Sequence, residues 1–597
     1  MQQLLLLSAL HLAKTSPTSS DTCCWCDPDT PNDKRTFVDS DSQINTLVFS
    51  DEFNDKTRNF QNGKDQKWTA LEVGDTSNKG AAFYLPEQAT VVQDKQASNA
   101  TKPVFALRIA TINESHTGDS PTGETGIEMP YKSAMLQSWN KFCFTGGVVE
   151  FRARSPRGAG YWPALWAFGN LGRAVYQNSN TGLWPWSYDQ CDASLDLPPS
   201  DPPQRISACM NHSYERDGLH PFQGRGATEI DVLEGAVTNS GNDSYSVGSL
   251  QLSPGIPAYF RPPMFGFPTT EGSGAWYSGL EFGPRGLPNN GWYGPPWGSD
   301  CPTGCPDALS GGLTKINDFD TRYWTYRMEW KTGPDGGIKW FYDNEFVWSI
   351  GAEAFDEYSV CSNKPGEKSD CKRTPKRQVP QEPMSLVMNT AIGTWNGGAS
   401  ALDGKHWPAE FYIDYVRVWQ SETNVGCDPP DYPTKKYIEK NAELYGEPVS
   451  PLGSDTCPEI YPESAYKHAD EIYARAQSRA TVAKTVQQTL LKEEAKTLLT
   501  TPADSRSEAT ERTFSTSGLK SDTISTMADG TSLPKDGGLS VARGGSSLSL
   551  LESASILGCT VVAMVLVVRR VKGRSPQRYD PFPTAEVSPT TEYELAT

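Results

Sequence analysis

Three carboxylic acids fall within six residues of the segment Thr228–Gly235, which reads TEIDVLEG. The residues between the acids are apolar, as in a β-strand with one buried face. In such a strand Glu229 and Asp231 share a face, and one extra residue, a β-bulge, turns Glu234 onto the same face. Retaining glycoside hydrolysis needs two carboxyl groups about 5–5.5 Å apart, one as nucleophile and one as acid/base. The segment therefore predicts a glycosidase site, with a solvated edge strand or a calcium site as the alternatives.

Tryptophans near this segment are candidates for sugar binding. The flat apolar faces of sugars stack on indole rings, which present a large area at low entropy cost. Trp184 and Trp186 lie between prolines and glycines in a long insertion, so we expect them to be exposed. The other candidates are Trp162, Trp166, Trp395 and Trp407. For each tryptophan the alternative is a place in the hydrophobic core.

The elements that position these residues are short strands. Alternating apolar and polar residues predict strands at 147–154, 323–331, 338–342, 384–390 and 411–419. Regular strands without helical periodicity between them favour an all-β sandwich. Two insertions rich in Pro, Gly and aromatic residues, 176–225 and 254–311, interrupt the pattern, and loops this long are usually functional.

The charge balance excludes one class of partner. The 597 residues include 54 basic and 72 acidic side chains, a formal net charge of −18. Such a chain lacks the basic face that phosphate neutralisation needs, so no nucleic acid partner is predicted. No phosphate-binding loop, metal motif or Ser/His/Asp set is evident, and the 6 histidines are scattered. We therefore predict neither a metal nor another cofactor.

The ends of the chain indicate a compartment. Residues 1–20 resemble a signal peptide without its basic n-region. Residues 548–568 are almost entirely apolar and, as a helix, reach about 31 Å, enough to cross a bilayer. Basic residues follow at once, which places the tail, 569–597, in the cytosol. We predict a single-pass membrane protein of the secretory pathway (Golgi, vacuole or plasma membrane), with its catalytic domain lumenal or extracellular.

Cysteines and sequons agree with that compartment. Of the 13 cysteines, Cys559 lies in the predicted span, which leaves an even number outside it. Irregular spacing without histidines at ligand intervals favours disulfides over zinc. Cys301 with Cys305, and Cys361 with Cys371, are each close enough to close a small loop, but the sequence does not determine the connectivity. Four N-glycosylation sequons are present, at Asn99, Asn113, Asn211 and Asn242.

Composition divides the remainder of the chain. A Cys-rich segment, 21–45, precedes the predicted catalytic domain, 46–420. A Cys-containing extension, 421–499, follows, and helical spacing of apolar residues predicts a helix over 464–499. Residues 500–547 are rich in Ser, Thr, Gly and Asp, which predicts a disordered stalk.

Several motifs resemble one family. Glu229–Glu234 looks like the catalytic strand of glycoside hydrolase family 16, the laminarinase-like β-jelly rolls. Other strands of that family are matched in the expected order by SDEFN at 50–54, GYWPALW at 160–166 and IDYVRV at 413–418. A narrower resemblance is to the β-glucan-synthesis-associated branch, known from yeast cell-wall assembly and its algal and oomycete relatives. It rests on GNLGR at 169–173, GLWPWSYD at 182–189, QRISAC at 204–209, GRGAT at 224–228 and VGCDPP at 425–430.

This resemblance covers roughly residues 45–450 and implies a β-jelly-roll sandwich. It further implies Glu229 as nucleophile, Glu234 as acid/base and Asp231 as the carboxylate that tunes the pair. The implied function is a membrane-anchored retaining β-glucanase or transglycosylase, acting on β-1,3- or β-1,6-glucan during synthesis of a cell-wall or storage polysaccharide. A degradative endo-β-1,3-glucanase and a non-catalytic glucan-binding assembly factor are the alternatives.

Overall fold

The structure is a computed structural model that describes residues 23–98, 103–192, 204–210, 215–237, 244–255, 278–288, 306–316, 318–362, 370–393, 398–402, 406–446 and 457–500. The chain forms two units, 1–484 and 485–597, and the described part of the second is residues 485–500. Within the described residues no helix is both long and apolar enough to cross a membrane. The predicted signal peptide, membrane span and cytosolic tail lie outside them, as does the stalk beyond residue 500.

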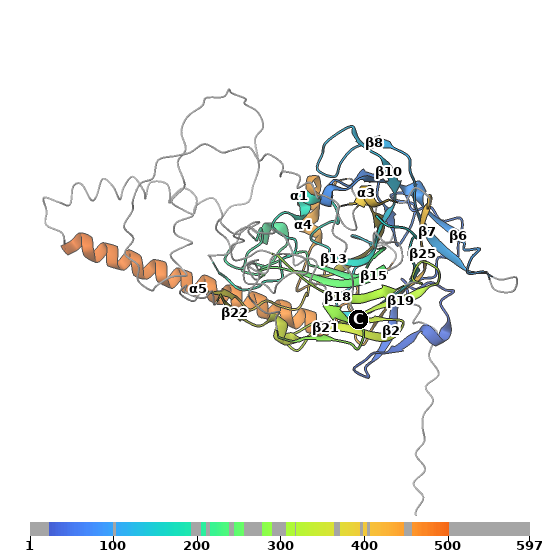
Figure 1. Cartoon of the computed structure of the whole chain (residues 1–597). Helices are drawn as coiled ribbons and strands as arrows, with labels where there is room; N and C mark the ends of the chain where they lie inside the picture. The colour runs from blue at the N-terminus through green and yellow to red at the C-terminus, as the bar shows by residue number, and fades with distance from the viewer. Residues whose placement is uncertain are drawn as a thin grey trace, which may run out of the picture. The chain divides into compact units, whose positions relative to one another are not determined.

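Two large sheets, whose strands pair antiparallel throughout, make up most of the first unit (Figure 1). The outer sheet has the order β1 (Thr36–Val38), β2 (Ile44–Asp51), β25 (Ala409–Gln420), β12 (Gly147–Arg154), β19 (Trp324–Lys331), β20 (Gly337–Tyr342), β21 (Glu345–Ile350) and β16 (Leu280–Phe282). β7 (Phe105–Thr111) also pairs with β25, and β6 (Ala89–Gln93) pairs with β7.

The inner sheet carries the predicted catalytic segment. Its order is β17 (Leu287–Pro288), β18 (Asp307–Ile316), β15 (Ser244–Leu252), β14 (Glu229–Val237), β13 (Trp162–Gly169), β24 (Met384–Ala391), β11 (Met135–Gln137) and β3 (Thr69–Ala70). β14 therefore has β13 on one side and β15 on the other. The predicted all-β sandwich is confirmed, and each of the five predicted strands is present within two residues of its expected bounds.

Smaller elements lie around the two sheets. The minor strands are β10 (Tyr131–Ser133), β5 (Ala82–Tyr84) and β4 (Val73–Gly74) in one sheet, β8 (His116–Gly118) with β9 (Ile127–Met129), and β22 (Tyr358–Ser362) with β23 (Asp370–Thr374). The α-helices are α1 (Gln177–Asn180), α3 (Gly398–Ala401), α4 (Lys435–Lys440) and α5 (Glu463–Thr500). The 3-10 turns are η1 (Asn32–Lys34), η2 (Ser77–Lys79), η3 (Pro86–Gln88), η4 (Glu215–Asp217), η6 (Ala352–Phe355) and η8 (Ala442–Leu444).

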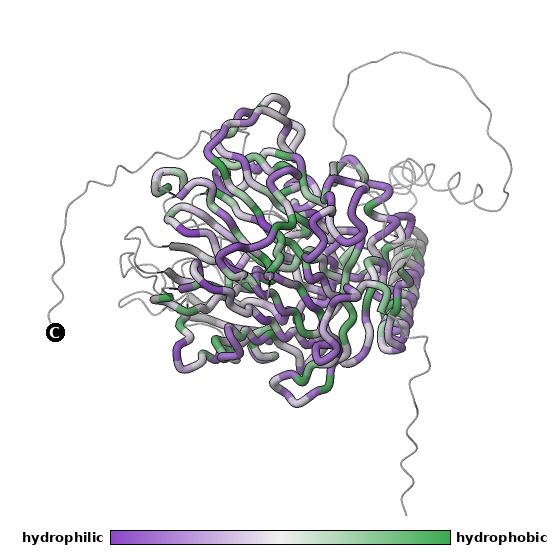
Figure 2. Tube along the Cα trace, turned by 90° about the vertical axis from the view of Figure 1, so that its right-hand side faces the viewer, coloured by the Kyte–Doolittle hydropathy of each residue, from purple (hydrophilic) through white to green (hydrophobic). Residues whose placement is uncertain are grey.

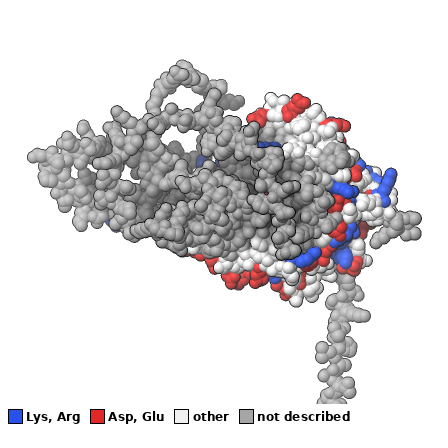
Figure 3. Space-filling model, viewed as in Figure 1, with Lys and Arg blue, Asp and Glu red and all other residues white. Residues whose placement is uncertain are grey.

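The main core lies between the two sheets. Phe151 of β12 faces it from the outer sheet, and Leu165 of β13 and Ile230 of β14 face it from the inner sheet, all with no exposed surface. Because strand side chains alternate, the residues between these point away from the core, and on β13 and β14 these include the candidate site residues. In Figure 2 hydrophobic segments run through the middle of the unit, while hydrophilic ones predominate in its outer loops. Acidic side chains line the lower edge of the described surface visible in Figure 3.

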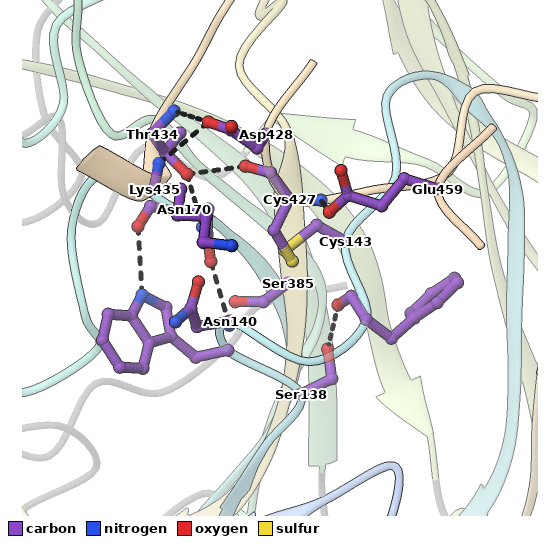
Figure 4. Close-up of a disulfide and its surroundings, with 12 residues drawn as sticks. Ser138, Asn140, Cys143, Asn170, Ser385, Cys427, Asp428, Thr434, Lys435 and Glu459 are labelled. Atoms are coloured by element: carbon purple, nitrogen blue, oxygen red, sulfur yellow. Dashed lines mark hydrogen bonds between the residues drawn. A yellow bond between two sulfur atoms is a disulfide. The ribbon is translucent and has the colours of Figure 1, made fainter. Parts of the chain in front are cut away.

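The described residues contain four disulfides, and two of them, Cys24–Cys457 and Cys143–Cys427, join segments far apart in the sequence (Figure 4 shows the second). The pairs are Cys23–Cys26, Cys24–Cys457, Cys143–Cys427 and Cys191–Cys209. The prediction of disulfides is therefore confirmed for these eight cysteines. Cys361 and Cys371 lie directly opposite each other in the register of β22 and β23. Cys301 and Cys305 lie outside the described residues.

The predicted helix is α5, whose first half packs on the first unit. Ala465, Ala469, Ile472 and Ala476 recur at helical spacing and are all buried. Arg479 donates to the carbonyl oxygen of Ala208 over 3.0 Å, in the insertion 176–225. The beginning of α5 therefore supports that insertion.

Candidate active site

β14 carries the three acids on one face because it has a bulge. Its pairing with β15 shifts register between Asp231 and Glu234, and its pairing with β13 shifts at the corresponding place. Without the shift Leu233 would face the same way as Asp231, but Leu233 is fully buried in the main core. The predicted bulge is confirmed, and it turns Glu234 onto the face of the other two acids.

Asp231 is the most enclosed of the three acids, with 2% of its surface exposed. The Ser249 hydroxyl and the Gln251 amide, both on β15, donate to its Oδ2. The backbone of β14 accepts two hydrogen bonds from side chains of β20 in the other sheet. Trp340 Nε1 donates to the carbonyl oxygen of Asp231 over 2.9 Å, and the Tyr342 hydroxyl donates to the carbonyl oxygen of Val232 over 3.0 Å. Both backbone contacts lie at the bulge, so they fix the strand where the acids change register.

Glu229 is half-buried and receives a hydrogen bond from the insertion 176–225. Trp184 Nε1 donates to Glu229 Oε2 over 2.7 Å. The backbone holds Trp184 in place, because its amide donates to Asn180 O over 2.8 Å and the amide of Ala227 donates to Leu183 O over 2.9 Å. A Cβ at Gly226 would lie 1.8 Å from the carbonyl oxygen of Trp186. Glycine therefore lets the insertion lie this close to the start of β14.

Glu234 has a similar partner from another segment. It is half-buried, and Trp162 Nε1 donates to its Oε1 over 2.9 Å. Trp162 begins β13, the strand beside β14. Each glutamate thus receives one indole N–H, and the two indoles come from different parts of the fold. An N–H donor stabilises a carboxylate more than a carboxylic acid, so both contacts favour the ionised forms.

Burial raises the pKa values of all three acids, and the charges of neighbouring acids raise those of Glu229 and Glu234 further. Burial is the largest cause at each, and it raises the pKa of Asp231 to about 6 against hydrogen bonds from Ser249 and Gln251 that lower it. For Glu229, burial and then the charges of Asp231 and Glu234 raise the pKa well above the usual range, against the Trp184 hydrogen bond. For Glu234, burial and then the charge of Asp231 raise the pKa well above the usual range, against the Trp162 hydrogen bond. The raised pKa values favour the protonated forms of Glu229 and Glu234, and an acid catalyst needs a protonated carboxyl group.

The other predicted tryptophans do not contact the three acids through their indole N–H groups in the way that Trp162 and Trp184 do. Trp166 is half-buried on β13, opposite Asp231 in register, and donates to Asn389 Oδ1 over 2.8 Å. The exposure predicted for Trp186 is wrong, because its side chain is 1% exposed and packs with Tyr188 within the insertion. Trp407 stacks on Tyr131 in a satellite cluster at a ring distance of 5.3 Å. Trp395 lies outside the described residues.

The remaining predicted features are only partly described. Asn113 is exposed, whereas Asn99, Asn211 and Asn242 lie outside the described residues. Most of the insertion 254–311 also lies outside them. In the described part of the chain no group of three or more His, Cys, Asp or Glu residues is placed to hold a metal ion.

Sequence reasoning missed Ser249, Gln251 and Asn389 as members of the site. Ser249 and Gln251 occupy alternating polar positions of β15, which pairs with β14. This alternation was the signal that could have identified them. Asn389 Nδ2 donates to the Tyr84 hydroxyl over 3.4 Å, and Tyr84 donates to Asp75 over 3.0 Å. This second network comes from segments that no local pattern connects.

The fold and the site together define a β-sandwich protein with three clustered carboxylic acids, two of them held by indole N–H groups. The family model described as "Beta-glucan synthesis-associated protein SKN1/KRE6/Sbg1" matches residues 9–263 and 305–451. The chain therefore belongs to this family of β-glucan synthesis-associated proteins. The predicted resemblance is confirmed.

Individual relatives agree with this assignment. The chain is 31% identical to Beta-glucan synthesis-associated protein KRE6 of Saccharomyces cerevisiae over 441 residues, which is 70% of this chain and 53% of that protein. It thus spans about half the length of this curated relative. It is 22% identical to Glucan endo-1,3-beta-glucosidase A1 of Niallia circulans over 63% of this chain and 38% of that protein. The solved endo-beta-1,3-glucanase from Pyrococcus furiosus matches 65% of this chain and 98% of its own, at a TM-score of 0.36 and 17% identity.

Proposed function

We propose that the protein is a retaining β-glucanase or transglycosylase that acts on β-1,3- or β-1,6-glucan during glucan synthesis. The observation that carries the proposal is the placement of Glu229 and Glu234 on one face of a bulged strand, with Asp231 between them and one indole N–H on each glutamate. Membership of the β-glucan synthesis-associated family and the similarity to a glucan endo-1,3-β-glucosidase support the substrate class.

In the proposed first step, Glu229 attacks the anomeric carbon of the sugar and forms a covalent glycosyl ester. Glu234, whose pKa burial raises, gives its proton to the glycosidic oxygen, so the leaving chain departs as a neutral alcohol. Glu229 also shares a hydrogen bond with Asp231. When Glu229 acts as nucleophile, that proton resides on Asp231, which keeps one charge rather than two beside the reacting carbon.

In the second step Glu234 acts as a base. It removes a proton from water or from a sugar hydroxyl, whose oxygen attacks the anomeric carbon and releases Glu229 as a carboxylate. Water gives hydrolysis and a sugar hydroxyl gives transfer. Transfer prevails when acceptor subsites hold the sugar in line, because oriented groups reach very high effective molarities. The insertion 176–225 contacts Glu229 through Trp184, so it lies where acceptor subsites could form, and this supports transfer over a degradative glucanase.

We propose that residues 548–568 anchor the protein in a membrane of the secretory pathway, with the catalytic unit on the lumenal or extracellular side. The four disulfides support an oxidising compartment. Protease protection of the catalytic unit in sealed microsomes, but not of a tag on the C-terminus, tests the orientation.

The test of the function is to incubate the purified ectodomain with laminari-oligosaccharides and measure product masses. Products longer than the donor support a transglycosylase, and only shortened products support a glucanase. Glu229→Gln keeps the side chain's shape and removes the nucleophile, so it should abolish both. A protein that binds oligosaccharides but leaves every bond intact would be the non-catalytic assembly factor instead.

A further inference from the structure

Four side chains provide the accessible surface of β13 and of residues 229–235 in β14. Trp162 and Trp166 are half-buried on β13, as are Glu229 and Glu234 on β14, and every other residue of these two stretches is buried. The backbone of Trp166 is paired with β14 on one side and with β24 on the other, so most of its exposed surface belongs to the indole. A ligand that reaches this face from solvent therefore meets two indoles and two glutamates.

A hydrogen bond sets the orientation of the Trp166 indole. Trp166 lies opposite Asp231 in register, and its Nε1 donates to Asn389 Oδ1 over 2.8 Å. Asn389 pairs with Ala164, which in turn pairs with Glu234. The indole therefore extends from the level of Asp231 toward the level of Glu234. Its bond to Asn389 decides which part of the ring system faces solvent beside the acids.

The side-chain amide of Asn389 can hold the indole in only one of its two orientations. An indole N–H only donates, so the amide oxygen has to face Trp166 and the amide nitrogen has to face the other way. There Nδ2 donates to the Tyr84 hydroxyl oxygen over 3.4 Å, and the single hydrogen of that hydroxyl goes to Asp75 Oδ2 over 3.0 Å. Asn389 and Tyr84 are 4% and 0% exposed, so bulk solvent supplies no alternative partner.

Asp75 sets the direction of this chain of hydrogen bonds. It is 6% exposed, and an ionised carboxylate only accepts, so Tyr84 has to donate to Asp75 and accept from Asn389. The backbone amide and the hydroxyl of Ser77 both donate to the other carboxylate oxygen. In the described part of the chain no lysine or arginine pairs with Asp75. A carboxylate buried without a cation is costly, which favours a functional role over a stabilising one.

The segment that carries Asp75 also borders the other exposed indole. A Cβ at Gly393 would lie 3.1 Å from the carbonyl oxygen of Asn78 and 3.3 Å from the ring of Trp162. Asn78 and Lys79 have φ angles of 49° and 55°, in the left-handed region that favours glycine. Backbone strain of this kind concentrates at functional sites. It agrees with a role of this segment in the site.

We propose that Asp75 is a positioning residue, which holds the Trp166 indole through Tyr84 and Asn389 as a surface for a sugar ring of the glucan. This role rests on the proposed function for its substrate class, and an indole is a surface on which a sugar ring stacks. If a donor replaced the acceptor at position 75, Tyr84 would have to give its hydrogen to Asn389. The amide of Asn389 would then turn its nitrogen toward the indole N–H. Two donors would face each other, and the indole would lose its orientation.

Asp75→Asn in the Glu229→Gln protein makes this change without turnover. The asparagine oxygen accepts from both donors of Ser77, so its amide nitrogen faces Tyr84 and donates to it. We expect the affinity for laminarihexaose, measured by isothermal titration calorimetry, to fall about fivefold, the loss expected for one neutral hydrogen bond.

Two comparisons separate positioning from general destabilisation. Ser133→Ala removes a buried hydrogen bond of 2.6 Å to the carbonyl oxygen of Thr390, in the same region, and should leave the affinity unchanged. Trp166→Phe removes the indole N–H, so Asp75→Asn should cause no further loss of affinity when Trp166→Phe is also present. A fivefold loss in both backgrounds, or an equal loss with Ser133→Ala, would make Asp75 merely structural and overturn the proposal.

The indole proton of Trp166 provides a measurement that needs no glucan. Its signal in a proton–nitrogen NMR spectrum is identified by its absence from Trp166→Phe, and Asp75→Asn should move it to lower frequency because the acceptor is lost. If Asp75→Asn does not fold, Tyr84→Phe replaces it: the Asn389 nitrogen loses its acceptor, so binding should weaken, again only when Trp166 is present. An unchanged affinity and an unmoved signal in the variant that folds would overturn the proposal. If Glu229→Gln binds no laminarihexaose, the proposed function fails, and the indole signal still decides whether Asp75 orients Trp166.

Discussion

Trp184 Nε1 lies 2.7 Å from Glu229 Oε2, although the tryptophan belongs to the insertion 176–225 and the glutamate to β14. The contact makes the insertion part of the candidate active site. It also gives Glu229 a donor that neither Asp231 nor Glu234 shares, since their donors are Ser249 with Gln251 and Trp162. The two glutamates thus receive their indole N–H donors from separate segments, so a mutation can remove one donor and leave the other in place.

Replacement of Trp184 by Phe should lower kcat/KM and move the acidic limb of the pH profile to higher pH. The change removes a donor to the ionised form of Glu229, so its pKa rises and a higher pH is needed to ionise it. A hydrogen bond to a charged group contributes about 1.5–3 kcal/mol, so kcat/KM should fall about 10- to 150-fold. Trp166→Phe is the control, because its indole donates to Asn389 and not to an acid. An acidic limb that moves equally in both variants would contradict this role of Trp184.

Replacement of Trp162 by Phe should instead move the alkaline limb. Trp162 donates to Glu234, and the loss of this donor raises the pKa of Glu234 further. The acid then stays protonated to higher pH, so the alkaline limb shifts upward while the acidic limb stays in place. Steady-state rates between about pH 4 and 10 measure both limbs. A shift of the acidic limb alone would assign Trp162 to the other glutamate.

The wild-type rate should depend on pH in a bell shape. Activity needs one ionised carboxylate in the coupled pair of Glu229 and Asp231, and it is lost as the pH falls below about 6, the pKa of Asp231. It also needs protonated Glu234, so it is lost as the pH rises through the raised pKa of that acid. A rate that keeps increasing below pH 5 would contradict this assignment.

Glu234→Gln should stabilise the protein at neutral pH. The folded-state pKa of Glu234 lies above its unfolded value, so its ionisation opposes folding once the pH exceeds the unfolded value of about 4.3. Glutamine removes this pH dependence and still accepts from Trp162. We expect a Tm higher by about 2–4 °C at pH 7 and equal to that of the wild type near pH 4. Calorimetry measures the Tm. A Tm of Glu234→Gln below that of the wild type at pH 7 would contradict a destabilising effect of the ionised Glu234.

Removal of the Cys143–Cys427 disulfide should destabilise the first unit by about 2–5 kcal/mol. The bond joins residues 284 positions apart, whereas Cys191–Cys209 joins residues 18 apart, so the chain-entropy argument predicts a smaller loss for the latter. Urea unfolding of the two double Cys→Ser variants without reductant measures the difference. A larger effect for Cys191 and Cys209 would contradict the anchoring role of Cys143–Cys427.

The sequence was sufficient for the five predicted strands, for α5 and for the acidic strand β14, because each has a local period or motif. Even the bulge at Asp231 and Glu234 followed from spacing, since the acids share a face only when one residue is added. The solvent exposure of the tryptophan side chains could not be predicted from a local pattern. Trp184 and Trp186 are two residues apart in one insertion, yet one touches Glu229 and the other is buried, because tertiary packing decides which indole faces the sheet. The apolar cluster that contains Met135 of β11 and Val387 of β24 likewise combines segments that only the fold brings together.

Trapping of the glycosyl intermediate tests the central claim most directly. A 2-deoxy-2-fluoro glucosyl or laminaribiosyl donor with an activated leaving group needs little acid assistance and slows the second step, so the covalent ester accumulates. Intact-mass spectrometry should show one added sugar residue, and peptide mapping should place it on Glu229, with no adduct in Glu229→Gln. An adduct on Glu234 or Asp231, or turnover of the donor without any adduct on β14, would contradict the assignment of Glu229 as nucleophile.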